Sequence, residues 1–248
     1  MNFFLILISV FGDLMAGFGA PGGVLLVSFL FSVTSLSTAE IAGTSSILFV
    51  FASLFVSSMY YYSGDVEWRL IIPLIPATLA GTSIGAQINS LIPREIFGFS
   101  LAILVVILGL SIAYREVKSL EPYYHLEYRN KQGIVILSFL GLLVGVIGGI
   151  FGIGGPAITI PTLIFLGIPN LKAIGAGMVQ GFFVTSSTAT NYALSGDISI
   201  DILVMIGPPF IISQLGGWYF AQNIEPEKLK AILGIMLAFL GPYIITAI

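Results

Sequence analysis

The sequence predicts an all-helical membrane protein built from two similar halves that face in opposite directions. Of its 248 residues, 57% are hydrophobic and 8% are charged, whereas about 25% of the residues of a soluble protein are charged. Apolar runs of about 20 residues, the length that spans a bilayer, recur along the chain. A pattern rich in glycine and proline near residue 20 also returns near residue 152.

The second glycine-rich stretch, Gly145–Pro161, is the centre of the prediction. It carries six glycines and two prolines within an apolar run. Inside a helix each Gly costs about 1 kcal/mol relative to Ala, and each Pro about 3 kcal/mol. We therefore predict that a helix breaks around Gly152–Gly155, and that a weaker copy of the break lies at Gly17–Gly23. Apolar segments broken at matching places in two halves are typical of the binding site of a secondary transporter.

The first half begins with an apolar segment, Asn2–Ala16, which leads into its glycine break. Ser63–Asp65 (Ser-Gly-Asp) is a turn signal, and Pro93 suits the first turn of a helix, where no N–H is needed. Between these signals the apolar runs predict a short helix after the break and three crossing helices: Val24–Val33, Ala39–Tyr62, Leu70–Ile88 and Ile96–Tyr114.

A polar loop, Arg115–Lys131, separates the halves, after which the same order of segments returns. We predict a first repeat over residues 1–114, a connecting loop over 115–131 and a second repeat over 132–248, in one folded unit. The second repeat is predicted to contain Gly133–Ile150, the break, Ala157–Leu166, a turn at Gly167–Asn170, Ala173–Leu194, the turn Ser195–Asp197, Ile202–Phe220 and Lys228–Ala247.

A constant shift along the chain relates the two halves. Gly22 corresponds to Gly154, a shift of 154 − 22 = 132. One helix fits a shift of 134 better, because Gly43 then corresponds to Gly177 (177 − 43 = 134), and this predicts a two-residue insertion before that helix and a deletion after it. The shift of 132 also pairs Gly17 with Gly149, Ser63–Asp65 with Ser195–Asp197, Pro76 with Pro208, Gly85 with Gly217, Glu95 with Glu227 and Gly109 with Gly241.

The distribution of Lys and Arg predicts the orientation, because these residues are in excess on the cytoplasmic side. If each broken segment is a hairpin that returns to its own side, each half crosses an odd number of times and the second half is inverted. With the central loop inside, eight of the nine basic residues are then cytoplasmic and only Arg94 is outside. If the broken segments cross once, the split is 5 to 4. We therefore expect a multi-pass protein of the cell membrane with both chain ends outside.

A helix that starts inside the membrane exposes unpaired N–H groups at an end with partial positive charge. Glycines just before such an end let an anion approach the backbone closely. Two inverted breaks would bring these helix starts face to face near the middle of the bilayer, forming an anion site without a buried Lys or Arg. The alternative is that the glycines only allow helices to pack closely.

Small polar side chains predict the lining of this site. Gln180, Ser187 and Asn191 lie on one helix face, and Ser46, Ser53 and Ser57 have the same spacing in the first half. They could bind an oxyanion, or form bonds between helices worth about 0.6 kcal/mol per pair. The predicted substrate-binding residues are Gly19, Gly22, Gly23, Ser46, Gly152, Gly154, Gly155, Gln180, Ser187 and Asn191.

Asp13 is the one carboxylate inside an apolar run. An acid within the membrane is a candidate for proton coupling, although Asp13 could also lie near water because its segment is short. The chain has no cysteine, and its single histidine, His125, lies in the polar loop. We therefore expect no catalytic constellation, no metal and no cofactor. A net charge of −3 without basic clusters argues against nucleic acid as a partner.

The run Gly148–Pro156, the Gly-Ile-Pro turn at Gly167–Pro169 and the Ser-Gly-Asp-Ile after a small-polar helix resemble the sulfite exporter TauE/SafE family. The resemblance extends over essentially the whole chain. It implies a transporter that moves sulfur-containing anions, such as sulfite or sulfonates, across the cytoplasmic membrane. The chain differs from the usual family pattern at Ala20-Pro21 and at Ala176–Met178, which leaves the substrate open.

We expect an alternating-access carrier in which the backbone at the two breaks holds the anion. Its expected partners are a small sulfur-containing anion, the lipid bilayer and a coupling proton. The alternatives are a passive anion channel, a carrier for another small solute, and a membrane subunit that scaffolds a partner without transport. The sequence carries no signal for an oligomeric state.

Overall fold

The computed structural model describes residues 6, 7, 10, 11, 14, 22–118, 126–221 and 240–245. Among these residues there are helices joined by short turns and no strand, so the predicted all-helical class is confirmed. The long helices are α2 (Gly22–Val33), α3 (Thr38–Tyr62), α4 (Trp68–Leu91), α5 (Arg94–Lys118), α6 (Lys131–Phe151), α7 (Pro156–Phe165), α8 (Asn170–Ser195) and α9 (Ile200–Ala221).

The predicted helices agree with the observed ones to within a few residues. The predicted interruption is present, since α6 ends at Phe151 and α7 begins at Pro156. The helix predicted to end at Tyr114 continues four residues further, to Lys118. The sequence Arg-Glu-Val-Lys that ends α5 consists mainly of good helix formers, which extends the helix beyond its apolar run. The first break and most of the predicted segments Asn2–Ala16 and Lys228–Ala247 lie outside the described residues.

Four of the described helices, α3, α4, α5 and α6, are long and apolar enough to cross a membrane. The predicted crossing Ala173–Leu194 is the helix α8, which is 26 residues long but is not among these four. Its sequence carries Lys172, Gln180, Asn191 and several Ser and Thr residues. Much of α8 is nevertheless buried, Gln180 completely, because α8 packs against α3, α4, α6 and α7.

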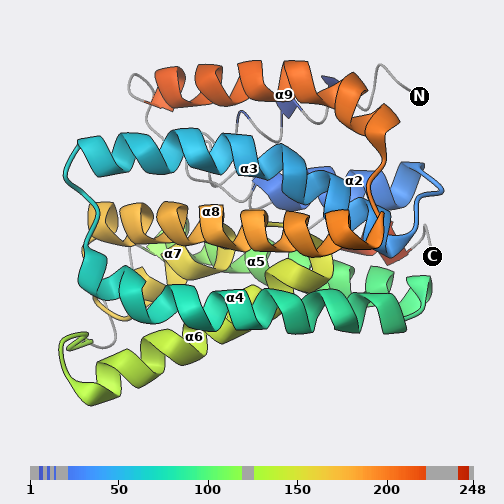
Figure 1. Cartoon of the computed structure of the whole chain (residues 1–248). Helices are drawn as coiled ribbons and strands as arrows, with labels where there is room; N and C mark the ends of the chain where they lie inside the picture. The colour runs from blue at the N-terminus through green and yellow to red at the C-terminus, as the bar shows by residue number, and fades with distance from the viewer. Residues whose placement is uncertain are drawn as a thin grey trace.

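The helices run side by side in two directions. In Figure 1, α9, α3, α8 and α4 cross the view one below another, and α6 diverges from α4 toward the left. α3 and α8 are antiparallel, since Gly43 near the start of α3 lies against Tyr192 near the end of α8, while Ser53 Oγ lies 3.1 Å from Thr185 Oγ1. α4 and α6 are parallel, since Gly81 lies against Gly145 and Gly85, one turn later, lies against Gly149.

The buried apolar side chains form two large clusters, and each cluster combines helices of both predicted halves. One cluster is built from α2, α3 and α5, together with α9, Phe151 and Ile153 at the break, and Ile244. The other is built from α6, α7 and α8, together with α4. Within the described residues, α9 thus packs in the core of the first predicted half and α4 in the core of the second.

Glycines allow α4 and α6 to pack backbone against backbone. Gly81 and Gly85 of α4 face Gly141, Gly145 and Gly149 of α6. A Cβ added at Gly81 would lie 3.0 Å from Gly145 Cα, and one added at Gly85 would lie 2.9 Å from Gly149 Cα. For Gly145 and Gly149 the packing alternative is therefore correct, because small residues let membrane helices approach closely.

Reciprocal contacts relate the two predicted halves. A Cβ at Gly43 would lie 2.3 Å from the carbonyl oxygen of Asp197, and one at Gly175 would lie 2.6 Å from that of Asp65. Both members of this pair of contacts are related by the same shift, because 175 − 43 = 132 and 197 − 65 = 132. A contact that recurs with its two partners exchanged is typical of a two-fold relation between similar units.

These contacts also correct the register predicted for one helix. Gly43 corresponds to Gly175 in its contacts, rather than to Gly177 as the shift of 134 predicted. Ser53 lies beside Thr185, which is its own equivalent at a shift of 185 − 53 = 132. No insertion or deletion is needed to relate α3 to α8. The shift of 134 had matched similar small residues that lie on different turns of the helix.

Arg94 closes the end of α2. Its guanidinium donates hydrogen bonds to the carbonyl oxygens of Phe31 at 2.7 Å, Thr34 at 2.9 Å and Leu36, and it lies 4.5 Å from the centre of the Phe31 ring. α2 has no basic residue in its own last turn. Arg94 therefore supplies the positive charge that stabilises the carbonyl end of a helix.

We predict that Gly145→Ala destabilises the protein by about 1–3 kcal/mol, because the added methyl group overpacks the contact between α4 and α6. The Cβ would lie 2.3 Å from the carbonyl oxygen of Thr78, so the backbones must separate. The measurement is the midpoint of thermal unfolding in detergent. Gly207→Ala is the matched control, because its Cβ would lie 3.8 Å from Leu48 Cδ2. Equal midpoints for the two variants would contradict the packing interpretation.

We expect a carboxyl group in the turn after α8 to make the stability of the protein depend on pH. Burial raises the pKa of Asp197 above its ordinary value, and the carboxylate of Glu40 raises it further. At pH values between the unfolded and the folded pKa, Asp197 is protonated in the folded protein and ionised in the unfolded chain. The resulting stability is fully present below the unfolded pKa of about 3.9 and is lost as pH rises through the folded pKa.

We therefore predict that raising the pH from about 4 to about 7 lowers the unfolding midpoint of the wild type more than that of Asp197→Asn. The amide does not ionise, so it removes this contribution while keeping the shape of the side chain. The measurement is thermal unfolding at a series of pH values. Parallel pH profiles for the two proteins would show that Asp197 does not titrate with folding.

Candidate functional site

The break between α6 and α7 depends on glycines that adopt a left-handed backbone. Gly152 ends α6 with φ of 69°, and Gly154 has φ of 76°, a region that other residues avoid. Gly155 is the N-cap of α7, and Pro156 occupies the first turn of that helix, where its missing N–H is not needed. All residues from Gly152 to Gly155 are buried.

The carbonyl groups at the end of α6 have hydrogen-bond donors. The last turn of a helix leaves carbonyl oxygens without partners inside that helix. Here side chains of three neighbouring helices supply the donors: Tyr192 Oη of α8 to Gly149 O at 2.8 Å, Asn89 Nδ2 of α4 to Ile150 O at 2.6 Å, and Ser45 Oγ of α3 to Gly152 O at 3.2 Å.

The N–H groups on the other side of the break have no such partners. Within the described part of the chain the backbone N–H groups of Ile153, Gly154, Gly155 and Ala157 make no hydrogen bond. Gly155 has no side chain to cap α7. Buried N–H groups without an acceptor are rare in proteins. The break therefore leaves backbone donors free at the start of α7, while carbonyl groups at the end of α6 have partners.

The start of α2 lies against this break. A Cβ added at Gly23 would lie 3.1 Å from the carbonyl oxygen of Ile153 and 2.9 Å from Phe49 Cζ. Two of the predicted binding regions, which are 130 residues apart in sequence (153 − 23 = 130), are thus neighbours in space. Gly22 begins α2, whereas Gly19 lies outside the described residues.

The start of α7 lies at the middle of α8. A Cβ added at Gly181 would lie 2.7 Å from Pro156 Cγ, and Gly181 is 11 residues after Asn170 and 14 before Ser195, the ends of α8. Gly155 packs against Val184, to which its Cβ would approach within 3.0 Å. If α8 crosses the membrane, the free N–H groups lie near its midplane.

Ser46 is completely buried, and its hydroxyl oxygen has no hydrogen-bond partner among the described residues. Its neighbour Ser45 holds the carbonyl group of Gly152. A buried hydroxyl group ordinarily finds a partner. Three other buried hydroxyl groups, those of Ser28, Ser186 and Thr188, likewise have no hydrogen-bond partner among the described residues.

Gln180 forms a hydrogen-bonded link between four helices. Its Oε1 accepts a hydrogen bond from Thr159 Oγ1 of α7 at 2.6 Å, and its Nε2 donates one to Thr78 Oγ1 of α4 at 2.8 Å. Thr78 Oγ1 in turn donates to the carbonyl oxygen of Gly141 in α6 at 3.1 Å. These bonds occupy one acceptor site and one donor of the amide, and they agree with the alternative that Gln180 forms bonds between helices.

The remaining predicted polar residues also bind within the protein. Ser187 Oγ lies 2.6 Å from Thr82 Oγ1 of α4, and Asn191 Nδ2 donates to the carbonyl oxygen of Ser187 at 3.0 Å. Ser53 Oγ lies 3.1 Å from Thr185 Oγ1 of α8. For Ser53 and Ser187 these bonds agree with the alternative of bonds between helices, and contact of Ser187 and Asn191 with a substrate stays a prediction.

Asp13, the predicted coupling residue, lies outside the described residues. Among the described residues there is no group of three or more His, Cys, Asp or Glu side chains that could hold a metal ion. The described part of the candidate site consists of backbone donors, hydroxyl groups and glycines.

Comparison with known proteins identifies the family. The model of the family described as "Sulfite exporter TauE/SafE" matches residues 3–244. The chain belongs to the sulfite exporter TauE/SafE family. This is the family whose glycine pattern the sequence resembles, and it is a family of membrane transporters.

Several curated TauE/SafE relatives cover most of the chain. The "Probable membrane transporter protein YunE" of Bacillus subtilis is 23% identical, over 90% of this chain and 89% of its own. The "Probable membrane transporter protein MJ0441" of Methanocaldococcus jannaschii is 25% identical, over 95% and 92%. The "Sulfite exporter TauE/SafE family protein 6" of Arabidopsis thaliana is 26% identical over 46% of this chain and 27% of its own. No solved structure matched this TauE/SafE chain.

Sequence reasoning missed the residues that hold the carbonyl side of the break. Asn89, Tyr192 and Ser45 lie far from Gly152 in the sequence, and only the packing of α3, α4 and α8 brings them to it. A signal was present for Asn89, which directly follows the predicted helix Leu70–Ile88 and is costly to bury unpaired. Nothing in the sequence separates Ser45 from its neighbour Ser46.

We predict that Gln180→Leu destabilises this TauE/SafE protein by about 1–3 kcal/mol, because it leaves the buried hydroxyl groups of Thr159 and Thr78 without their amide partner. Asn191→Leu is the control, since Asn191 bonds only to the backbone of its own helix among the described residues. The measurement is thermal unfolding in detergent. A normal midpoint for Gln180→Leu together with lost transport would instead make Gln180 a substrate contact.

Proposed function

We propose that this protein is a secondary transporter for small anions, with sulfite or sulfonate-type compounds as the substrate class. The observation that carries the proposal is that the buried N–H groups of Ile153, Gly154 and Gly155 make no hydrogen bond, while carbonyl groups at the end of α6 have donors. Backbone N–H groups at the start of a helix favour an anion through both hydrogen bonds and the helix dipole. The choice of sulfur compounds rests on the family's description.

The proposed site binds its ligand without a positively charged side chain. The N–H groups of Gly154 and Gly155 would donate to the anion's oxygens, with Gly23 opposite and the hydroxyl group of Ser46 as a further donor. A Lys or Arg at this depth would bind an anion strongly and slow its release. A site of neutral dipoles suits a carrier, which must release its substrate in each cycle.

We further propose that residues 1–114 and 132–248 are inverted repeats joined by the segment 115–131. The reciprocal contacts of Gly43 and Gly175 support a two-fold relation. The antiparallel packing of the equivalent helices α3 and α8 supports an axis perpendicular to them. For helices that cross a bilayer, such an axis lies in the membrane plane and inverts one repeat relative to the other.

The α6–α7 segment is proposed to be a hairpin that returns to its own side of the membrane. The N–H of Leu126 donates to the carbonyl oxygen of Leu166 at 2.8 Å, and Leu126 lies five residues before the start of α6 at Lys131 (131 − 126 = 5). The end of α7 therefore lies near the start of α6. This supports a hairpin and, with three crossings in each half, an odd number of crossings.

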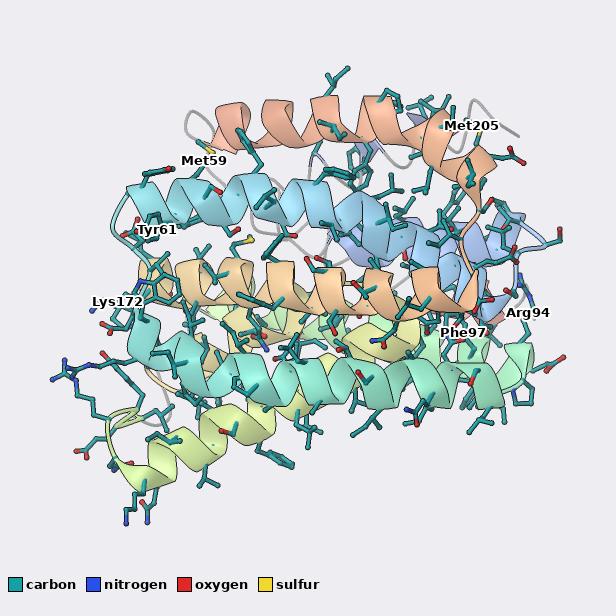
Figure 2. All side chains as sticks on the ribbon, viewed as in Figure 1. Met59, Tyr61, Arg94, Phe97, Lys172 and Met205 are labelled. Carbon is teal, nitrogen blue, oxygen red and sulfur yellow. The ribbon has the colours of Figure 1, made fainter. Side chains whose placement is uncertain are left out.

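The positions of the basic residues support a cytoplasmic connecting loop. Arg69, Lys131 and Lys172 lie at the starts of α4, α6 and α8, and Figure 2 shows Lys172 and Arg94 at opposite ends of the molecule. Basic residues are in excess on the cytoplasmic side. Arg94, the exception, is engaged with carbonyl groups at the end of α2. Under this orientation both chain ends lie outside the cell.

Alternating access is proposed to occur between the two apolar cores. Phe151 and Ile153, at the break, pack in one core, whereas Val144 of α6 and Leu163 of α7 pack in the other. The break thus lies where the two cores meet. Rocking of one core against the other would expose the site to each side in turn.

The membrane potential is proposed to drive export. When an anion leaves a cell with a negative interior, its free energy falls by about 2.3 kcal/mol per charge per 100 mV. Export therefore needs no coupling ion, whereas import against this potential would need one. Asp13 is then the candidate carrier of a coupling proton.

Counterflow in reconstituted vesicles tests the proposal. Vesicles loaded with unlabelled sulfite should accumulate labelled sulfite transiently and saturably, because a carrier exchanges the two. Thiosulfate, taurine and acetate as competitors would define the substrate class. Flux without counterflow would indicate a channel, and the absence of flux for every anion would favour a scaffold.

We predict that Gly155→Asp lowers sulfite flux at least about tenfold relative to Gly155→Ala, because a carboxylate at the N-cap accepts from the free N–H groups and repels the anion. Both substitutions add the same Cβ beside Val184, so Gly155→Ala controls for crowding. Because a capping side chain stabilises a helix by about 0.5–2 kcal/mol, Gly155→Asp should unfold at the same or a higher temperature than Gly155→Ala. Equal flux for the two variants would exclude the anion from this helix end.

A further inference from the structure

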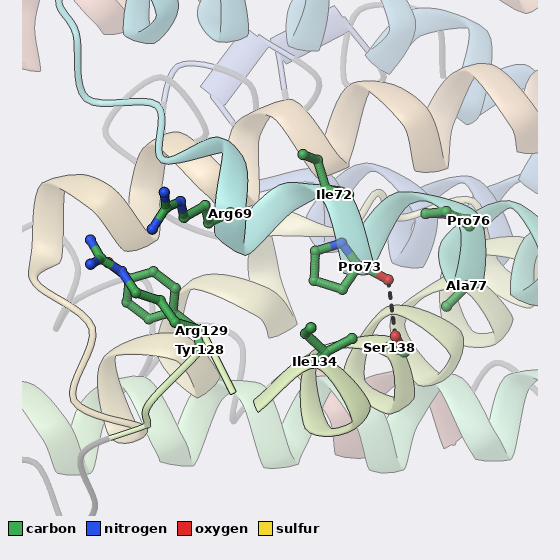
Figure 3. A pocket seen from close by; sticks show the side chains of 9 residues that line it. All are labelled: Arg69, Ile72, Pro73, Pro76, Ala77, Tyr128, Arg129, Ile134 and Ser138. Carbon is green, nitrogen blue, oxygen red and sulfur yellow. Dashed lines mark hydrogen bonds between the residues drawn. The ribbon is translucent and has the colours of Figure 1, made fainter. Parts of the chain in front are cut away.

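A pocket distinct from the break opens between the first turns of α4 and the chain leading into α6. It has a volume of about 690 Å³, within the range of about 300–1,000 Å³ that is usual for small-molecule sites. Figure 3 shows its lining from α4 on one side and from residues 128–138 on the other. The lining residues are Arg69, Ile72, Pro73, Pro76, Ala77, Tyr128, Arg129, Ile134 and Ser138.

The pocket exists because α4 and α6 separate toward their starts. Their glycine contacts begin at Gly141, whose Cβ would lie 2.4 Å from the carbonyl oxygen of Leu74. Nearer the start of α6 the facing residues are larger, and Ser138 Oγ still reaches the carbonyl oxygen of Pro73 at 3.3 Å. Beyond that point the helices diverge, as Figure 1 shows for the start of α6. The gap is thus set by where the glycines stop.

The lining is charged at one end and apolar along its length. Arg69 and Arg129 extend toward the same end of the pocket, whereas Pro76 and Ala77 lie at the other end (Figure 3). From Arg69 to Ala77 is 77 − 69 = 8 residues, or about 12 Å along a helix. This is close to half of the hydrocarbon thickness of about 30 Å, which is the depth of one leaflet.

The two guanidinium groups are available to a ligand. Both arginines are exposed, and neither forms an ion pair or hydrogen bond with another described residue. The ion pair found at this end of the described chain joins Lys172 to Glu67 at 3.5 Å. Arg69 and Arg129 therefore present two positive charges beside an apolar groove.

We propose that this pocket binds an anionic phospholipid of the leaflet at the basic end of the molecule. The phosphate and headgroup would lie between Arg69 and Arg129, and part of an acyl chain would lie along Ile72, Pro76 and Ile134. Basic pockets between crossing helices on the cytoplasmic side are a recognised mode of binding anionic lipid headgroups.

The chemistry of the pocket favours a lipid over a small soluble anion. A free phosphate or sulfite ion would use the two arginines but would leave the apolar lining without a function. Ile72 is 64% exposed and Ile134 is 46% exposed, at a depth where the surrounding medium is lipid if α4 and α6 cross the bilayer. An amphiphile with an anionic head matches both parts of the pocket.

The test uses the full-length protein in neutral detergent with short-chain phosphatidylglycerol as the probe. Phosphatidylcholine with the same chains tests the charge, and glycerol phosphate tests the need for acyl chains. Binding is followed by native mass spectrometry and by the shift in unfolding midpoint. We expect phosphatidylglycerol to bind more tightly than either of the other probes. Equal binding of phosphatidylcholine, or displacement by an equal concentration of glycerol phosphate, would overturn the proposal.

Variants locate the site. Arg69→Gln and Arg129→Gln should each weaken phosphatidylglycerol binding about fivefold, the effect of one basic residue at an anionic surface. Lys131→Gln removes the same charge two residues from Arg129 but does not line the pocket, and it should have no effect. Equal losses for Arg129→Gln and Lys131→Gln would mean that only the general positive charge of this end matters.

A second variant tests the apolar end of the pocket. Ala77→Phe fills that end without changing charge, so it should weaken phosphatidylglycerol binding while leaving the weak binding of glycerol phosphate unchanged. Unchanged lipid binding in Ala77→Phe would exclude the acyl-chain position. If Ala77→Phe does not fold, the Arg69→Gln and Arg129→Gln variants test the site. Sulfite counterflow of the same variants reports on the break separately.

Discussion

Inside a bilayer every backbone polar group must find a partner within the protein, and at the break between α6 and α7 the end of α6 meets this constraint more fully than the start of α7. Tyr192, Asn89 and Ser45 supply donors to carbonyl groups at the end of α6. The N–H groups that follow have no acceptor in the described chain. The donors to those carbonyl groups come from α3, α4 and α8, so the carbonyl groups are occupied only when the three helices pack around the break. The same packing therefore decides which backbone groups at the site stay free.

The sequence predicts the helices and the break well, because hydropathy and the energetic cost of Gly and Pro in a helix are local properties. It also brings Gly23 and Gly152–Gly155 to notice as one region, and they are neighbours in the structure. The sequence could not predict which of several similar residues has which structural role. Gly145 and Gly149 serve packing, whereas Gly152 and Gly154 serve the turn, and this depends on partners in other helices.

The polar residues of α8 show the same limit. Helical spacing places Gln180, Ser187 and Asn191 on one face, but the face alone does not say what lies opposite. In the structure Thr159 and Thr78 meet Gln180, and Thr82 meets Ser187, so part of the predicted lining connects helices. The register error in α3 has a related cause, since small residues recur so often in this chain that two shifts fit one helix almost equally.

The exchange of α4 and α9 between the two apolar cores has a consequence for how such a protein can arise. Among the described helices, α9 packs with α2, α3 and α5 in one core, and α4 packs with α6, α7 and α8 in the other. A polypeptide that contained one half alone would expose the apolar side chains that α9 or α4 covers in this chain. Two such polypeptides could cover these side chains only by exchanging the two helices. Joining them in one chain makes that packing intramolecular and therefore independent of protein concentration.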